Sequence, residues 1–315
     1  MVKRFQNKVA ESRLALPLTG VYALLVWIAM GLLGGEMWVQ FACFVVSAYL
    51  MVELNNSNAL IRIYSRMVSC SFLALSCMAC FTFSSEAEAI VGLCFIASYT
   101  TLLRSYQDRG AAGWIFYTFV CLGLGSIVNI HLLYYVPIVW ILMMSYLRSM
   151  SVRTFVASLL GLLVPYWFAA VYFIYIGDFS VPEKRLAELV TFENPLDMST
   201  MAIQPNQIFV LAFVVILAIV GIIHYVRTSY NDKIRIRMYY DSFILVDVLT
   251  MVFLLLQPQH FDMLLRILIV NTSMLIAHFI ALTHTKITNI AFCVIFAVII
   301  LLTAYNLWMP SLICW

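Results

Sequence analysis

Apolar stretches long enough to cross a membrane recur along this whole chain. A helix rises about 1.5 Å per residue, so about 20 apolar residues cross a hydrocarbon core of about 30 Å. Of the 315 residues, 64% are hydrophobic and 10% are charged. The pattern predicts an all-α, polytopic transmembrane helical bundle, and no polar segment is long enough to form a soluble domain with its own core.

We predict about eleven spans. They cover approximately residues 17–34, 38–52, 68–84, 88–103, 114–131, 132–147, 154–176, 207–226, 243–257, 263–282 and 288–309. Three of them are short and the fifth and sixth are joined by hardly any turn residues, so a count lower by one or two also fits. Residues 1–315 then form a single integral membrane domain, with seven spans over 17–176, an outer loop over 177–206 and four spans over 207–309.

The basic residues predict the orientation. With the N-terminus inside, fifteen of the eighteen Lys and Arg residues lie on the cytoplasmic side, and only Lys184, Arg185 and Arg266 lie outside. Basic residues in short loops set the orientation of membrane proteins. We therefore predict a cytoplasmic N-terminus and an external C-terminus.

The cysteines give no indication of a metal or redox site. Seven of the eight fall inside predicted spans, where a thiol is usually a small core residue. Cys77 and Cys80 have redox-motif spacing, but they lie within a predicted membrane helix without a second ligand pair. We expect no metal and no cofactor. The basic runs lack a glycine pattern that would cradle a nucleotide, and we expect no nucleic acid partner.

Two polar residues lie inside predicted spans, and their presence there has to be explained. An ionisable group at the membrane centre costs roughly 2.5–3.5 kcal/mol on insertion scales. Asp247 is expected near the inner boundary, where it can extend to water or pair with Arg235 or Arg237; a polar cavity or a proton-coupled role is the alternative. His131 follows Asn129 at an outer boundary. It either forms hydrogen bonds between helices or faces an outward cavity and exchanges a proton.

A third polar group is the segment Gln257–Asp262, followed by Arg266. Asp262 and Arg266 are four residues apart at a predicted helix start, which is the spacing of an ion pair. His260 adds an acid/base group. Because Arg offers a fixed fork of donors to phosphate oxygens, this segment suits a lipid-linked phosphate. The structural alternative is a capped turn with a salt bridge.

Two further segments are expected at the membrane surface. Residues 181–190 read as a short amphipathic helix in the outer loop, although a plain loop fits almost equally well. The Asn-rich segment 53–58 is expected to form a re-entrant or surface-lying turn, with Arg62 and Arg66 anchoring it to lipid phosphates.

Short motifs give the chain a likeness to a known family. They are Glu53-Leu54-Asn55-Asn56, Gly123-Leu124-Gly125-Ser126 before His131-Leu132-Leu133-Tyr134-Tyr135, and Arg237-Met238-Tyr239-Tyr240. With them, most of the chain resembles a family of bacterial multi-pass inner-membrane proteins from gliding and gut-dwelling didermal bacteria, whose domain has no established activity. The resemblance implies that the protein lies in the bacterial inner (cytoplasmic) membrane.

In general shape the chain is also similar to polytopic membrane glycosyltransferases that use polyprenyl-phosphate sugars. Those enzymes usually carry an acidic residue just after the first span, and Glu36 occupies this place. The loop that holds Glu36 is shorter than theirs, and their second acid is missing. The resemblance implies an activity on lipid-linked glycan.

We therefore predict a role in cell-envelope biogenesis, in which the protein handles polyprenyl-phosphate-linked glycan on the outer leaflet. The catalytic candidates are Glu36, His260 and Asp262, and the substrate-binding candidates are Arg266, His131, Lys184 and Arg185. One alternative is a transporter or flippase with Asp247, Asn271 and His278 along its path. Another is a non-catalytic membrane subunit that binds a membrane protein partner. Membrane lipids are expected partners in each case.

Overall fold

The computed structural model describes residues 4–35, 37–177, 187, 189 and 204–313. These residues form helices and connections, without a strand among them. The α-helices are α1 (Phe5–Glu11), α2 (Ala15–Ala29), α3 (Trp38–Asn58), α4 (Met67–Met78), α5 (Glu86–Leu102), α6 (Ala112–Val128), α7 (Tyr135–Ser145), α8 (Val152–Ile176), α10 (Pro205–Thr228), α11 (Ile234–Leu256), α12 (Phe261–Leu282) and α13 (Lys286–Ile313). Short 3₁₀ helices lie between them at η1 (Cys80–Ser84), η2 (Leu103–Ser105), η3 (Ile130–Tyr134), η4 (Ser229–Asn231) and η5 (Pro258–His260).

The described helices fit a multi-pass membrane protein. Seven of them are long and apolar enough to cross a membrane, and α1 with α2 makes an eighth if their 89° bend belongs to one span. The segments Met67–Met78, Ala112–Val128 and Ile130–Ser145 are shorter apolar helices. Each of the eleven predicted ranges overlaps one of these helical segments. The predicted all-α membrane bundle is therefore confirmed, whereas the number of spans stays a prediction.

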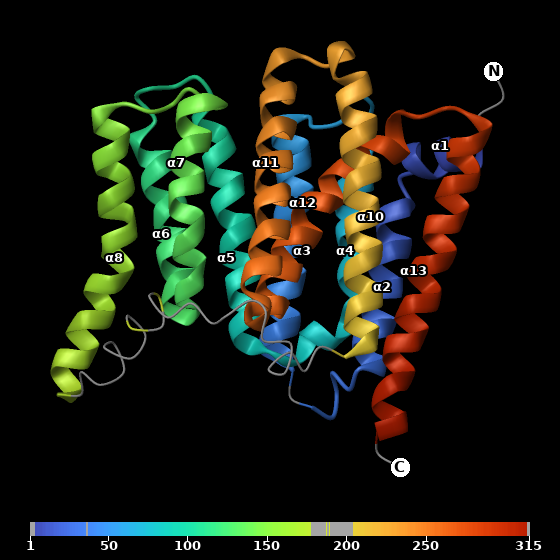
Figure 1. Ribbon diagram of the computed structural model, residues 1–315, viewed down its shortest axis with the longest axis horizontal. Helices are drawn as coiled ribbons and strands as arrows, with labels where there is room; N and C mark the ends of the chain where they lie inside the picture. Colours follow the sequence, from blue (N-terminus) through green and yellow to red (C-terminus); the bar gives the residue numbers. More distant parts are fainter. Residues whose placement is uncertain (1–3, 36, 178–186, 188, 190–203, 314–315) are drawn as a thin grey trace.

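The long helices run side by side, and the two ends of the chain lie at opposite ends of the bundle (Figure 1). The connections α3–α4, α5–α6, α7–α8 and α10–α11 lie at the end where the N-terminus is found. We call this end the basic end, because these four connections include Arg62, Arg66, Arg109 and Arg148. The connections α4–α5, α6–α7 and α11–α12, which contain η1, η3 and η5, lie at the opposite end.

Helix α12 forms the centre of the bundle. In its most apolar 18-residue window 94% of the residues are buried, against 11% in that of α8 and 17% in that of α13. It packs against α4, α5, α10 and α11. Its polar residues Asn271, Thr272, Ser273 and His278 are fully buried. Since lipid offers no hydrogen bonds to such groups, a central position among other helices is the place where this span can satisfy them.

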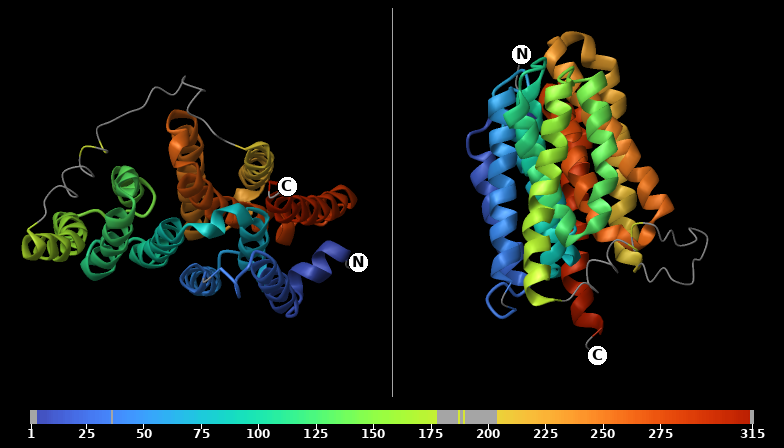
Figure 2. Two further views of the ribbon diagram at one scale, coloured as in Figure 1. Left: turned by 90° about the horizontal axis from the view of Figure 1, so that it is seen from below. Right: turned by 90° about the vertical axis from the view of Figure 1, so that its left-hand side faces the viewer.

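Helix α8 lies at the edge of the bundle, far from α12 (Figure 2). It packs chiefly on α6, and its outer face exposes large apolar side chains such as Trp167 and Phe168. An exposed apolar surface of this kind is suited to lipid contact. The helix begins with a capping box, in which Ser151 and Thr154 exchange side-chain to backbone hydrogen bonds.

The Asn-rich segment 53–58 does not form the predicted turn. It continues helix α3, which ends at Ala59 in the left-handed region at φ 49°. The helix continues because its amides have partners: Asn58 Nδ2 donates to the Leu54 carbonyl at 3.0 Å, and Asn55 Nδ2 donates to the Ser65 carbonyl at 2.8 Å. The predicted surface helix at 181–190 lies almost wholly outside the described residues.

Candidate functional site

Two histidines that are far apart in the sequence stack at the end opposite the basic end. The rings of His131, on η3, and His260, on η5, have centroids 3.6 Å apart and planes tilted by 32°. The turn η3 begins after Asn129, whose Oδ1 accepts the backbone N–H of His131 at 3.2 Å. The turn η5 begins at Pro258, which suits a first helical position because it has no N–H. Each histidine therefore lies on a short turn between two helices.

A hydrogen-bond chain fixes the protonation pattern of the His131 ring. Asn129 Nδ2 donates to Glu88 Oε1 at 3.0 Å, and this bond sets which end of the amide faces His131. Asn129 Oδ1 lies 3.2 Å from His131 Nδ1. An amide oxygen only accepts, so Nδ1 carries the hydrogen, and Nε2 is the basic nitrogen of the neutral ring. Glu88 of α5 thus orients a potential acid/base group.

Both rings line a cavity of about 370 Å³. Its walls come from η3 and α7 on one side and from α11, η5 and α12 on the other. They are formed by His131, Tyr134, Tyr135, Pro137, Phe253, Leu256, Gln257, His260, Met263 and Leu264. Nearly all of the exposed wall is apolar. The site is therefore an apolar cavity with two imidazole rings among its lining groups.

Arg266, another predicted substrate ligand, does not line this cavity. Arg266 donates to the carbonyl of Thr82 on η1 and borders a separate cavity of about 30 Å³. It forms no ion pair with Asp262, whose Oδ1 is buried without a hydrogen-bond partner. Arg266 thus satisfies a backbone carbonyl between α4 and α5. The candidates Glu36, Lys184 and Arg185 lie outside the described residues.

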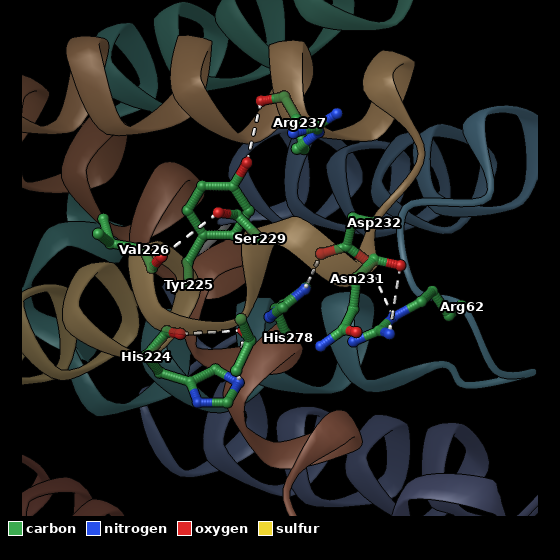
Figure 3. Close-up of polar contacts among 10 residues, drawn as sticks. Arg62, His224, Tyr225, Val226, Ser229, Asn231, Asp232, Arg237 and His278 are labelled. Carbon is green, nitrogen blue, oxygen red and sulfur yellow. Dashed lines mark hydrogen bonds and ion pairs between the residues drawn. The ribbon is translucent and has the colours of Figure 1, made fainter.

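A second polar cluster joins three segments near the basic end (Figure 3). Asp232, between η4 and α11, forms an ion pair with Arg62 Nε at 2.8 Å and lies 3.1 Å from His278 Nε2. The side chains of Asp232 and His278 are fully buried, and 37% of the Arg62 side chain is exposed. Tyr240 packs edge-on against His278 at 4.8 Å. This cluster fastens the α3–α4 and α10–α11 connections to the central helix.

We did not predict this cluster from the sequence. Asp232 lies in a polar run that reads as a solvated turn, and Arg62 reads as a lipid anchor. The available signal was His278, because an imidazole within an apolar span needs a polar partner. The sequence did not indicate which of the loop carboxylates supplies it.

A third polar group lies inside the bundle. Thr272 Oγ1 donates to Asp247 Oδ1 at 3.3 Å, and the Tyr99 hydroxyl donates to Asn271 Oδ1 at 2.8 Å. The predicted pairing of Asp247 with Arg235 or Arg237 is wrong. Helix α11 begins at Ile234 rather than near residue 243, so Asp247 lies more than three turns inside it and is fully buried.

Within the described part of the chain, no group of three or more His, Cys, Asp or Glu side chains is arranged to hold a metal ion. The sequence matches no protein-family model and no curated protein, and the structure matches no solved structure. The family resemblance therefore stays a prediction, and the function has to be argued from the sites themselves.

Proposed function

We propose that this protein handles a lipid-linked glycan during cell-envelope biogenesis, and that the cavity beside His131 and His260 receives the part of the substrate where lipid meets phosphate. In this proposal the bundle lies in a bacterial inner membrane, all eleven helical segments cross it, and the basic end faces the cytoplasm. The histidine cavity then opens at the outer leaflet. This placement follows the positive-inside rule applied to the connections of the basic end.

The observation that supports this proposal best is the apolar cavity bordered by two imidazole rings. Its volume of about 370 Å³ lies in the range of small-molecule sites, and the wall between α7 and α11 is mostly apolar. An isoprenoid chain suits that wall. The stacked imidazoles lie where a phosphate or a glycosidic oxygen would follow the chain, and a positioned histidine is the commonest general acid/base group.

The individual roles follow from the geometry. His131 has a fixed tautomer through Asn129 and Glu88 and acts as a hydrogen-bonding or basic group toward substrate. His260 contacts the His131 ring, lines the cavity and is the acid/base candidate. Arg266 is assigned a structural part, because its guanidinium is directed at the Thr82 carbonyl.

The test is the profile of lipid-linked and surface glycans in a deletion strain, measured by mass spectrometry. We expect one polyprenyl-linked intermediate to accumulate and the wild-type gene to remove it. His260→Ala should reproduce the accumulation, since loss of general acid/base catalysis costs about 10²–10⁴-fold in rate. His284→Ala is the matched control, because His284 is exposed near the basic end and outside the cavity.

An unchanged glycan profile in the deletion strain would contradict the proposal. The alternatives would then be a transporter or a membrane subunit bound to a partner. A detergent-solubilised pull-down that returns one stoichiometric membrane protein would favour the subunit over the transporter.

A further inference from the structure

Asp247 is a carboxyl group deep in the bundle without a cationic partner. Its residue is 0% exposed, and no ion pair in the described part of the chain includes it. Oδ1 accepts one long hydrogen bond from Thr272, at 3.3 Å, and Oδ2 is buried with no partner at all. A carboxylate in this position would be a buried charge that is neither paired nor solvated.

Such a charge is far more costly to bury than a neutral carboxylic acid. The surroundings therefore suit the protonated form. A purely structural polar residue at this position would be expected to satisfy both polar atoms of its side chain, as Asn271 does: its Oδ1 accepts from the Tyr99 hydroxyl and its Nδ2 donates to the Ile267 carbonyl. An ionisable residue inside a membrane bundle indicates a functional site in the first instance.

Two hydroxyl groups lie near Asp247 in the direction of the histidine cavity. Thr250 is three residues further along α11, so it lies on the same face as Asp247. Its hydroxyl donates to the Val246 carbonyl at 2.7 Å, and the Tyr135 hydroxyl, 2.9 Å away, must therefore be the donor to Thr250. Tyr135 lines the cavity. A hydrogen-bonded pair of hydroxyl groups thus lies between the cavity wall and the face of α11 that carries Asp247, although Thr250 forms no hydrogen bond with Asp247 itself.

The titratable groups that face Asp247 are few. Tyr99 approaches from α5 and Tyr135 from α7. On α12 the facing side chains are Asn271 and Thr272, and the nearest titratable group toward the basic end is His278, two turns further on. The buried α10 side chains at the level of the bundle interior are apolar, such as Val210 and Val214.

We propose that Asp247 is a proton-binding site that exchanges with water in the cavity beside His131 and His260. On release, the carboxyl O–H bond breaks and the proton passes to water that enters from the cavity, leaving a carboxylate. On uptake the same bond reforms, and no electron transfer is involved. This inference goes beyond the proposed function, because it is independent of what else the cavity binds.

The proposal has a consequence for conformation. Deprotonation would leave an unpaired charge between α11 and α12, so the two protonation states favour different packings of these helices. A bundle of this kind can couple proton movement to transport or to opening of the cavity.

Infrared difference spectroscopy of the full-length protein in lipid nanodiscs tests the proposal. We expect a carbonyl stretch of a protonated carboxylic acid that shifts in D₂O and is absent from Asp247→Asn. Asp241→Asn, on the same helix, is the matched control and should keep the band.

A second variant covers the case in which Asp247→Asn fails to fold. Thr272→Val removes the one hydrogen bond to the carboxyl group, so the band should move to higher frequency. Spectra of Asp247→Asn and wild type that superimpose, or a band that neither Thr272→Val nor Asp247→Asn alters, would overturn the assignment. An unchanged glycan profile in the deletion strain would leave it standing.

Discussion

At the residue scale, buried polar side chains determine which parts of this bundle are joined. Asp232 contacts a cation from one connection and an imidazole from the central helix. His131 is held in one tautomer by Asn129, which Glu88 orients in turn. In each case the hydrogen-bonded group includes a side chain from a different helix or connection, and this fixes two elements relative to one another.

The Asp232 contacts give a first prediction. Asp232→Asn should lower the free energy of unfolding by roughly 1.5–3 kcal/mol, because it removes the charged acceptor of both Arg62 and His278. The measurement is reversible unfolding in detergent micelles, followed by tryptophan fluorescence.

Glu53→Gln is the matched control for this change. Glu53 pairs with Arg104 at 3.5 Å, and both side chains are about 40% exposed (39% and 40%). An exposed pair of this kind contributes about 1 kcal/mol or less. Equal losses in the two variants would mean that burial of the Asp232 cluster adds nothing to its contribution.

At the residue scale the sequence predicted some site residues and missed others. His131 and His260 were selected for their chemistry, and the structure brings them into contact. Arg266 was selected for the same reason, yet it binds a backbone carbonyl. Residue type indicates what a side chain is able to do, whereas the neighbour that it meets depends on how the helices pack.

At the element scale, close helix contacts depend on glycines. A Cβ atom on Gly161 of α8 would lie 2.4 Å from the Phe116 carbonyl oxygen of α6, and one on Gly221 of α10 would lie 2.8 Å from the Leu275 Cβ atom of α12. Small residues let helix backbones approach closely, which matters in a membrane because lipid competes equally for apolar side chains.

The Gly161 contact gives a second prediction. Gly161→Ala should push α8 away from α6 and destabilise the protein by about 1–3 kcal/mol, the usual cost of overpacking. The same unfolding measurement in detergent micelles applies. The control is Gly20→Ala in α2, where a Cβ atom would meet nothing within 4 Å.

Gly20→Ala should be neutral or slightly stabilising, since Ala has the higher helix propensity by about 1 kcal/mol. A Gly161→Ala protein as stable as Gly20→Ala would show that α8 is held by other contacts, such as the hydrogen bond from Trp140 Nε1 to Ser158 Oγ.

At the scale of the whole molecule, the unequal distribution of basic residues between the two ends predicts which end faces the cytoplasm. Single cysteines at Ser57, exposed at the basic end, and at Ser84, exposed at the opposite end, report the side of the membrane in a cysteine-free background. We expect a membrane-impermeant maleimide to label Ser84→Cys in cells with a permeabilised outer membrane, and to label Ser57→Cys only after lysis.

The reverse labelling pattern would invert the orientation and place the histidine cavity at the cytoplasmic leaflet. Labelling of both cysteines from the same side would mean that the chain crosses the membrane an even number of times between them, contrary to the span assignment.

The sequence by itself determined the class of fold and the approximate position of its helices. A span must satisfy its backbone hydrogen bonds internally and must match the thickness of the membrane, and both conditions are visible as runs of apolar residues. The clearest boundary errors were polar helix ends: α3 continues through Asn58, and α11 begins at Ile234, before its predicted start. Backbone and side-chain hydrogen bonds extend these helices beyond the apolar run.

Only the tertiary structure decided which span is central and which polar groups meet. The run of α12 is about as apolar as that of α11, with a hydropathy of 1.8 for each, yet one is buried over 94% of its window and the other over 44%. Apolar side chains serve equally well against lipid and against protein, so their pattern does not distinguish the two neighbours. Close packing at glycines and the partners of His278, Asp247 and His131 make that distinction, and these depend on segments distant in the sequence.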